Sequence, residues 1–113
     1  MASKPLRHPE MDRVTVADLL HALADPTRLA IVFELSRSES GLNCSETVSR
    51  VGVPLPKSTC SQHYQILRES GLIRCERRGV ELTSHLRREE LSAHFPGLLD
   101  AILHAHRKAK PPA

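Results

Sequence analysis

After about a dozen residues without periodicity, apolar positions recur three and four residues apart, at Val16, Leu19, Leu20 and Leu23. This spacing predicts an amphipathic helix over residues 16–24. Asp25 and Pro26 predict the start of a second helix, because aspartate caps helices well and proline is tolerated at the first helical position. The second helix is apolar around most of its circumference up to Ser36, so we expect it at the centre of the core.

A short third helix is predicted to end at Gly52, with Asn43 or Ser45 as its N-terminal cap. Val48 and Val51 are expected to face inward from it. The prolines at positions 54 and 56 of the next segment disfavour helical geometry, so a tight linker should follow.

A fourth helix is predicted over residues 57–70 and should stop at Gly71. Its apolar face consists of Cys60, Tyr64, Ile66 and Leu67. Its opposite, polar face consists of Ser58, Thr59, Ser61, Gln62, Gln65 and Arg68. The polar face is uncharged where the helix begins and basic further along.

The last third of the chain predicts a hairpin and then another helical region. Residues 72–83 alternate apolar and polar side chains around Arg78 and Gly79, which is typical of a half-solvated two-stranded wing. Residues 88–106 return to helical spacing, but Pro96 and Gly97 interrupt them. The last helix is therefore broken, or begins afresh, near Pro96.

These elements predict one mainly α-helical domain with a two-stranded β wing and five helices, over residues 13–106. Residues 1–12 and the basic, proline-ended residues 107–113 are expected to be flexible tails. No apolar run is long enough to span a bilayer, and the N-terminus lacks the pattern of a secretory signal. We therefore expect no membrane association.

Composition narrows the classes of function. Sixteen basic and thirteen acidic residues give a net charge of +3, which favours a polyanionic partner. An aromatic content of 3% argues against stacking on single-stranded nucleic acid. The three cysteines are 16 and 15 positions apart, which fits neither a disulfide framework nor a zinc pattern and favours the cytoplasm. No catalytic triad, phosphate loop or carboxylate pair is apparent, so we expect no enzyme.

Three strings occur in order along the chain: Ala-Leu-Ala-Asp-Pro-Thr-Arg-Leu-Ala-Ile at 22–31, Lys-Ser-Thr-Cys-Ser-Gln-His at 57–63, and Leu-Arg-Glu-Ser-Gly-Leu-Ile at 67–73. With these strings, residues 16–103 resemble the ArsR-type winged helix-turn-helix repressors. The resemblance implies a bacterial, cytoplasmic, homodimeric transcriptional repressor that an unidentified signal releases from double-stranded DNA. The fourth helix would enter the major groove of a pseudo-palindromic operator. The N-terminal and C-terminal helices would form the dimer interface.

The side chains expected to contact DNA are Lys57, Ser58, Thr59, Ser61, Gln62, His63, Arg68, Arg77 and Arg78. Short polar side chains near a helix start can reach base edges, and Gln62 suits an adenine. The helix N-terminus together with Lys57 attracts phosphate. The alternative for the serines and the threonine is a solvated face with a capping role.

Four of these residues have competing structural roles. His63 lies between the two faces, so it contacts phosphate or packs partly buried. Arg68 contacts the DNA backbone or pairs with a carboxylate. Arg77 and Arg78 bind phosphate or enter the minor groove, or else are solvated. Arg28, in the second helix, is not in the contact set, and it is expected to form a buried or half-buried ion pair.

The chain departs from the family at both metal sites that the resemblance brings in. Many members hold metals through a Leu-Cys-Val-Cys-Asp segment, whereas residues 42–46 here read Leu-Asn-Cys-Ser-Glu. A lone thiolate there makes a poor soft-metal site. On the last helix, Asp100 and His104 form half a zinc site or a solvated pair. We therefore expect no metal and no cofactor.

Two further hypotheses remain open at this point. Oxidation of Cys60 or Cys75 can alter DNA affinity, although Cys60 shares the apolar face with Tyr64 and Leu67, where a buried thiol packs as a small hydrophobe. Alternatively, the chain is a winged-helix protein-interaction module that binds another chain through its last helix and has lost DNA binding.

Overall fold

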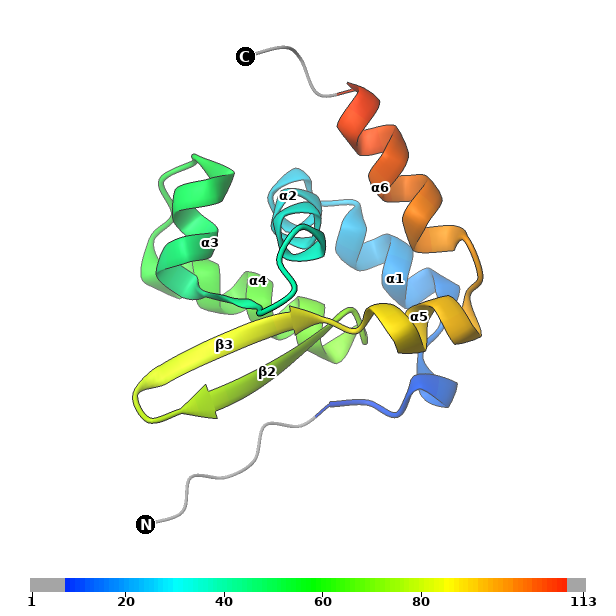
Figure 1. The fold of residues 1–113 in the computed structure, drawn as a ribbon, viewed down its shortest axis with the longest axis horizontal. Helices are drawn as coiled ribbons and strands as arrows, with labels where there is room; N and C mark the ends of the chain where they lie inside the picture. Colours follow the sequence, from blue (N-terminus) through cyan, green and yellow to red (C-terminus); the bar gives the residue numbers. More distant parts are fainter. Residues whose placement is uncertain (1–7, 110–113) are drawn as a thin grey trace.

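The computed structural model describes residues 8–109 (Figure 1). The helices are η1 (Met11–Arg13, a single 3-10 turn), α1 (Val16–Leu23), α2 (Pro26–Ser36), α3 (Cys44–Val51), α4 (Lys57–Glu69), α5 (Arg88–His94) and α6 (Leu98–Ala109). The strands are β1 (Leu42–Asn43), β2 (Ile73–Arg78) and β3 (Glu81–Leu86). The predicted helices, the hairpin and the break at Pro96 are all confirmed.

The predicted number of elements is wrong in two places. Within residues 8–109 there are six α-helices instead of five, because the break at Pro96 separates α5 from α6. The sheet has three strands in the order β1-β3-β2, since Leu42 and Asn43 pair antiparallel with β3. A two-residue strand is too short for alternation of apolar and polar side chains to reveal it.

Side-chain caps set the starts of the first two helices. Thr15 and Asp18 form a reciprocal capping box at α1. The Asp25 carboxylate accepts hydrogen bonds from the backbone N–H groups of Thr27 and Arg28, at 2.8 and 3.0 Å. The predicted ion pair of Arg28 is replaced by a different contact, because its Nε donates to the carbonyl oxygen of Ala22 at 2.8 Å. Arg28 thereby supplies a hydrogen-bond donor to a carbonyl group at the C-terminal end of α1.

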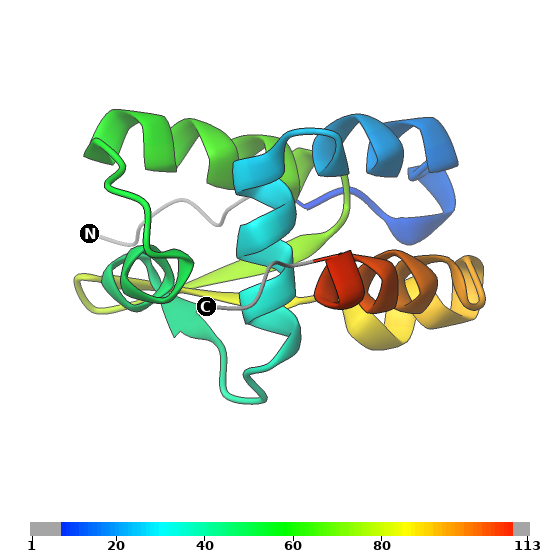
Figure 2. The ribbon, with the colours of Figure 1, turned by 90° about the horizontal axis from the view of Figure 1, so that it is seen from above.

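Helix α2 occupies the centre of the molecule, as predicted. Ile31, Val32 and Leu35 are at most 1% exposed. Figures 1 and 2 show α2 between α3 and α4 on one side and α1 and α6 on the other. The hairpin of β2 and β3 extends toward the side that holds α3 and the start of α4.

Helices α3 and α4 follow the predicted start and stop residues. Asn43, not Ser45, caps α3, where its side chain accepts from the N–H of Glu46 at 2.8 Å. Gly52 ends α3 in the left-handed conformation, with φ of +77°. The four-residue linker then leads into α4, whose apolar face packs against the core through Cys60, Tyr64 and Leu67.

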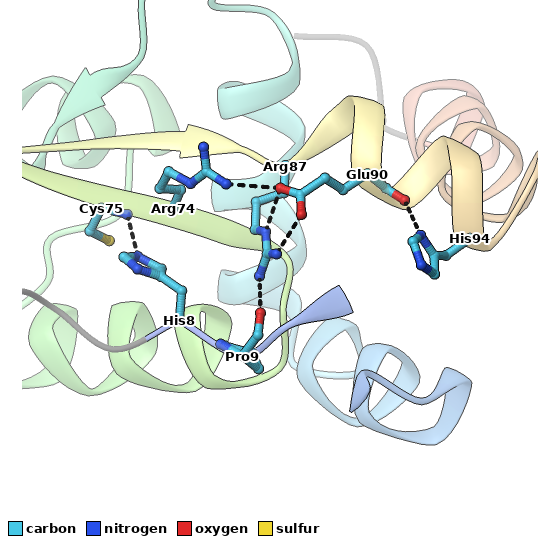
Figure 3. Close-up of polar contacts among 7 residues, drawn as sticks. All are labelled: His8, Pro9, Arg74, Cys75, Arg87, Glu90 and His94. Atoms are coloured by element: carbon cyan, nitrogen blue, oxygen red, sulfur yellow. Dashed lines mark hydrogen bonds and ion pairs between the residues drawn. The ribbon is translucent and has the colours of Figure 1, made fainter. Parts of the chain in front are cut away.

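Part of the predicted N-terminal tail packs against the domain. The Nε2 of His8 accepts a hydrogen bond from the backbone N–H of Cys75 at 2.9 Å, and Arg87 donates to the carbonyl of Pro9 at 2.8 Å (Figure 3). Met11 is buried in the core. Helix α6 continues to Ala109, beyond the domain boundary predicted at residue 106. The remaining parts of the predicted tails, residues 1–7 and 110–113, lie outside the described residues.

Within the described part of the chain, no helix combines the length and the apolar character that a bilayer crossing needs.

Candidate nucleic-acid interface

The outward face of α4 carries uncharged polar side chains. Ser58, Ser61 and Gln62 are exposed, and Thr59 is half-buried. The helix holds these side chains in place because its opposite face is anchored in the core. A row of hydroxyl and amide groups on a rigid helix is able to donate to and accept from base edges.

The first turn of α4 has unpaired backbone amides. Pro56 stands at the N-cap and supplies no side-chain acceptor. The first amide of this helix bonded to a backbone carbonyl is that of Cys60, which donates to Pro56 at 3.0 Å. The preceding N–H groups therefore carry the partial positive charge of the helix start, and the exposed Lys57 adds a full charge beside them. This end of α4 favours an anion such as phosphate.

A groove of about 990 Å³ lies between α3, α4 and the hairpin; we call it the wing groove. Its polar lining includes Lys57, Ser61, Gln65 and Arg68 from α4, and Arg77, Glu81 and Ser84 from the hairpin. Three of these side chains are cationic and one, Glu81, is anionic. The cationic side chains come from two elements that are separate in sequence. The wing groove therefore concentrates positive charge beside the polar face of α4.

The two wing arginines point to opposite faces of the hairpin. Arg77 lines the wing groove with α4, whereas Arg78 lines a second pocket on the other face. Arg78 also pairs with Glu76, Nη2 to Oε2 at 3.6 Å. Successive residues of a strand face opposite sides, so only Arg77 shares a surface with α4.

Arg68 and His63 are both half-buried. The Nε of Arg68 and the Nδ1 of His63 are buried and make no hydrogen bond to any described residue. Arg68 lines the wing groove, and within residues 8–109 it has no ion pair with a carboxylate. His63 lies on the other flank of α4, near Asp25. The pKa of Asp25 is lowered mainly because it accepts the N–H of Arg28, with smaller contributions from the charges of Arg28 and His63.

The predicted contact set does not include Gln65, although this residue belongs to the polar face. It is exposed and lines the wing groove. Its position three residues after Gln62 places both amides on the same face of the helix. That spacing was visible in the sequence and was sufficient to include Gln65.

The acid–histidine pair of α6, which the sequence offered as half a zinc site or a solvated pair, lies among cations. Asp100 and His104 line a pocket together with Arg37, Arg88 and Arg107. Across residues 8–109, no three His, Cys, Asp or Glu side chains gather closely enough to hold a metal ion.

A family model described as a helix-turn-helix domain matches residues 23–76. The HTH-type transcriptional repressor SmtB of Mycobacterium tuberculosis is 40% identical over 92 residues, which are 81% of this chain and 63% of SmtB. The uncharacterized HTH-type transcriptional regulator YceK of Bacillus subtilis is 31% identical over 86 residues, 76% of this chain and 84% of YceK. The solved structure of the ArsR family transcriptional regulator RHA00566 has a TM-score of 0.61 and 27% identity, and covers 82% of this chain and 92% of that one. The chain belongs to the ArsR family of transcriptional regulators.

The ArsR fold extends over most of the described residues. The homodimeric winged helix-turn-helix DNA-binding domain of Mb0332 from Mycobacterium bovis shares it with a TM-score of 0.62 and 23% identity, over 87% of this chain and 86% of that domain. This ArsR-family chain spans under two thirds of the length of SmtB, 63%. The matched relatives are named as transcriptional regulators.

Proposed function

We propose that this chain is a sequence-specific DNA-binding transcriptional repressor that acts as a homodimer on a pseudo-palindromic operator. The observation that carries the proposal is that Ser61 and Gln65, from the exposed polar face of α4, line one groove together with Arg77 of the hairpin. Base-reading groups and phosphate-binding charges are thus available on one surface. SmtB, which is 40% identical, is named a repressor, and this supports repression as the effect on transcription.

The residues divide between two roles in this proposal. Ser58, Ser61 and Gln62 read base edges in the major groove, where the Gln62 amide bonds an adenine through N6 and N7. Lys57 and the amides of the first turn bind phosphate. Gln65 joins the reading face.

The remaining candidates are assigned by their position around α4. Arg68 and Arg77 contact the DNA backbone from the wing groove. Thr59 and His63 reach phosphate from the opposite flank of the helix. Arg78 contacts DNA from the outer face of the hairpin after releasing Glu76, which costs little because both side chains are exposed.

Homodimerisation is proposed through α1 and α6. Val16 and Leu20 of α1 are 44% and 50% exposed. No residue of α6 is buried, although many side chains of this helix are apolar. The two helices adjoin, because Leu19, Leu23, Leu98 and Ile102 line one small pocket. A second copy covering this surface would bury apolar area that one copy leaves in water.

The proposed place of action is the cytoplasm, where bacterial DNA lies. Cys44, Cys60 and Cys75 are all free thiols, which agrees with a reducing compartment. No catalytic step is part of the proposed role.

The experiment that tests the proposal starts from bound genomic fragments, recovered with the purified protein. Affinity for a recovered site is then measured by fluorescence anisotropy at several salt concentrations. A repressor of this kind should lose affinity steeply with salt, with a slope near −0.9 for each phosphate contacted. If no fragment is enriched over random DNA, and Lys57→Ala with Gln62→Ala leaves binding to a partner protein intact, the protein-interaction alternative replaces this proposal.

A further inference from the structure

Two cysteine sulfur atoms meet where α3 and α4 adjoin. Cys44 is the first residue of α3 and Cys60 lies in the first turns of α4, and their Sγ atoms are 3.0 Å apart. Sulfur atoms in a disulfide are about 2.05 Å apart. If an oxidant removes the two thiol hydrogens, the sulfur atoms need to approach by only about 1 Å to form the covalent bond.

The two thiols differ in their access to solvent. Cys44 is exposed, whereas Cys60 is 1% exposed. Both line the wing groove, so a small molecule entering the groove reaches the pair from the Cys44 side. Cys75 is arranged differently, because it is buried and its Sγ lies 3.3 Å from the hydroxyl of Ser84.

We propose that Cys44 and Cys60 form a peroxide-oxidisable dithiol site whose disulfide ties α3 to α4. The oxidant class is a hydroperoxide, either hydrogen peroxide or an organic hydroperoxide. The site uses two cysteines that do not coincide with the paired-cysteine positions of the Leu-Cys-Val-Cys-Asp segment.

The reaction takes place in two steps that balance. In the first step, the Cys44 thiolate attacks one peroxide oxygen, the O–O bond breaks, and water or an alcohol leaves after taking up a proton. This step oxidises Cys44 to a sulfenic acid and reduces the peroxide by two electrons. In the second step, the Cys60 sulfur attacks the Cys44 sulfur, the S–O bond breaks, and the departing hydroxide leaves as water with the Cys60 proton. The products are one disulfide, one water, and one further water or alcohol.

The order of the two steps follows from burial. Burial, reinforced by the neighbouring Cys44 thiol, raises the pKa of Cys60 to about 12. Because the thiolate is the nucleophile, Cys60 is a poor first reactant at neutral pH. The exposed Cys44 therefore reacts with peroxide, and the adjacent Cys60 resolves the sulfenic acid.

The disulfide has a consequence for DNA that rests on the proposed function. The bond would draw the start of α4 toward α3 and fix the angle between these helices. Ser58, Ser61 and Gln62 belong to that part of α4, and base contacts require placement to within about 0.5 Å. We therefore expect oxidation to lower operator affinity several-fold.

The chemical test uses the full chain treated with stoichiometric hydrogen peroxide, alkylated, and mapped by mass spectrometry without reduction. The expected product is a peptide pair joined through Cys44 and Cys60, two hydrogens lighter than the reduced peptides and restored by dithiothreitol. Cys44→Ser, a change at an exposed position, should abolish the link, whereas Cys75→Ala should retain it. A link between Cys44 residues of two chains, a link to Cys75, or sulfinic acid at Cys44 without a disulfide would each overturn the proposal.

The DNA test is kept separate from the chemical one. Oxidised wild type should bind a recovered operator several-fold more weakly than reduced wild type, while peroxide should leave the affinity of Cys44→Ser unchanged. If the disulfide forms and affinity is unchanged, the regulatory consequence is overturned. If reduced protein binds no DNA, the proposed function fails, and the disulfide map still decides the proposal on the dithiol.

Discussion

Arg87 and Glu90 form a two-bond ion pair, with Nε to Oε1 at 3.0 Å and Nη2 to Oε2 at 2.7 Å. The Arg87 side chain is 4% exposed, and its remaining nitrogen donates to Pro9. Glu90 also accepts from Arg74 of β2 at 3.0 Å (Figure 3). Through Arg74 and Arg87, the Glu90 carboxylate thus links the hairpin, the start of α5 and the N-terminal segment.

Glu90→Gln should destabilise the fold at neutral pH and have less effect in acid. Hydrogen bonding by Arg87, together with the charges of Arg87 and Arg74, lowers the pKa of Glu90 from 4.5. A carboxyl whose pKa is lower in the folded state contributes stability above its unfolded pKa and loses that stability as pH falls through the folded value. We expect a loss of about 1 kcal/mol at pH 7, since the carboxylate is partly exposed.

Urea unfolding of Glu90→Gln and wild type between pH 7 and pH 3 measures this difference. Glu89→Gln, at an exposed neighbour on α5, is the matched control and should show no such trend. A gap between Glu90→Gln and wild type that stays constant down to pH 3 would contradict the role assigned to this pair.

Gly71→Ala should destabilise the protein more than Gly52→Ala. Both glycines have positive φ, +92° and +77°, which costs an alanine about 1 kcal/mol. A Cβ at Gly71 would also lie 2.4 Å from a methyl carbon of the buried Val14, whereas a Cβ at Gly52 meets nothing within 4 Å. We expect about 2–4 kcal/mol for Gly71→Ala and about 1 kcal/mol for Gly52→Ala by urea unfolding. Equal losses of stability for the two variants would show that the Val14 side chain moves aside without an energetic penalty.

Loss of the backbone contact of His8 should loosen β2 locally. The Nε2 of His8 accepts from the amide of Cys75, 67 positions away in sequence. His8→Ala removes this acceptor, so the Cys75 amide should exchange with solvent faster, and stability should fall by about 1 kcal/mol. Amide hydrogen exchange followed by NMR measures both effects. Unchanged protection of the Cys75 amide would mean that the N-terminal segment does not hold β2.

Polar substitutions on α1 should weaken the proposed dimer. Val16→Ser combined with Leu20→Ser removes the exposed apolar surface of that helix while leaving the buried side intact. Sedimentation equilibrium should show the variant shifted toward monomer, with a dissociation constant at least about tenfold higher. Val80→Ser is the control, because Val80 is 98% exposed at the wing tip and away from α1. Equal dissociation constants for the two variants would place the dimer interface elsewhere.

The sequence predicted those elements whose signals are local. The spacing of apolar residues located the helices, and Asp25, Gly52 and Gly71 marked starts and stops through side-chain caps and positive φ. The same local reasoning located the polar face of α4. Helix periodicity also places Gln65 on that face, and strand periodicity separates Arg77 from Arg78, although the predicted contact set used neither signal.

The features that the sequence did not reveal depend on contacts between distant residues. Strand β1 exists because Leu42 and Asn43 meet β3, about 40 positions later in the chain. The contact of Cys44 with Cys60 depends on how α3 crosses α4, which no spacing within either helix determines. The same holds for the packing of His8 on β2 and for the wing groove.

The central claim is that the outward face of α4 reads DNA sequence. The most direct measurement compares the affinities of wild type, Gln62→Ala and Arg77→Ala for a recovered operator and for unrelated DNA of equal length. Gln62→Ala should lose about 1–3 kcal/mol on the operator and almost nothing on unrelated DNA, whereas Arg77→Ala should lose affinity for both. If Gln62→Ala distinguished the operator from unrelated DNA as well as wild type does, that result would contradict the claim.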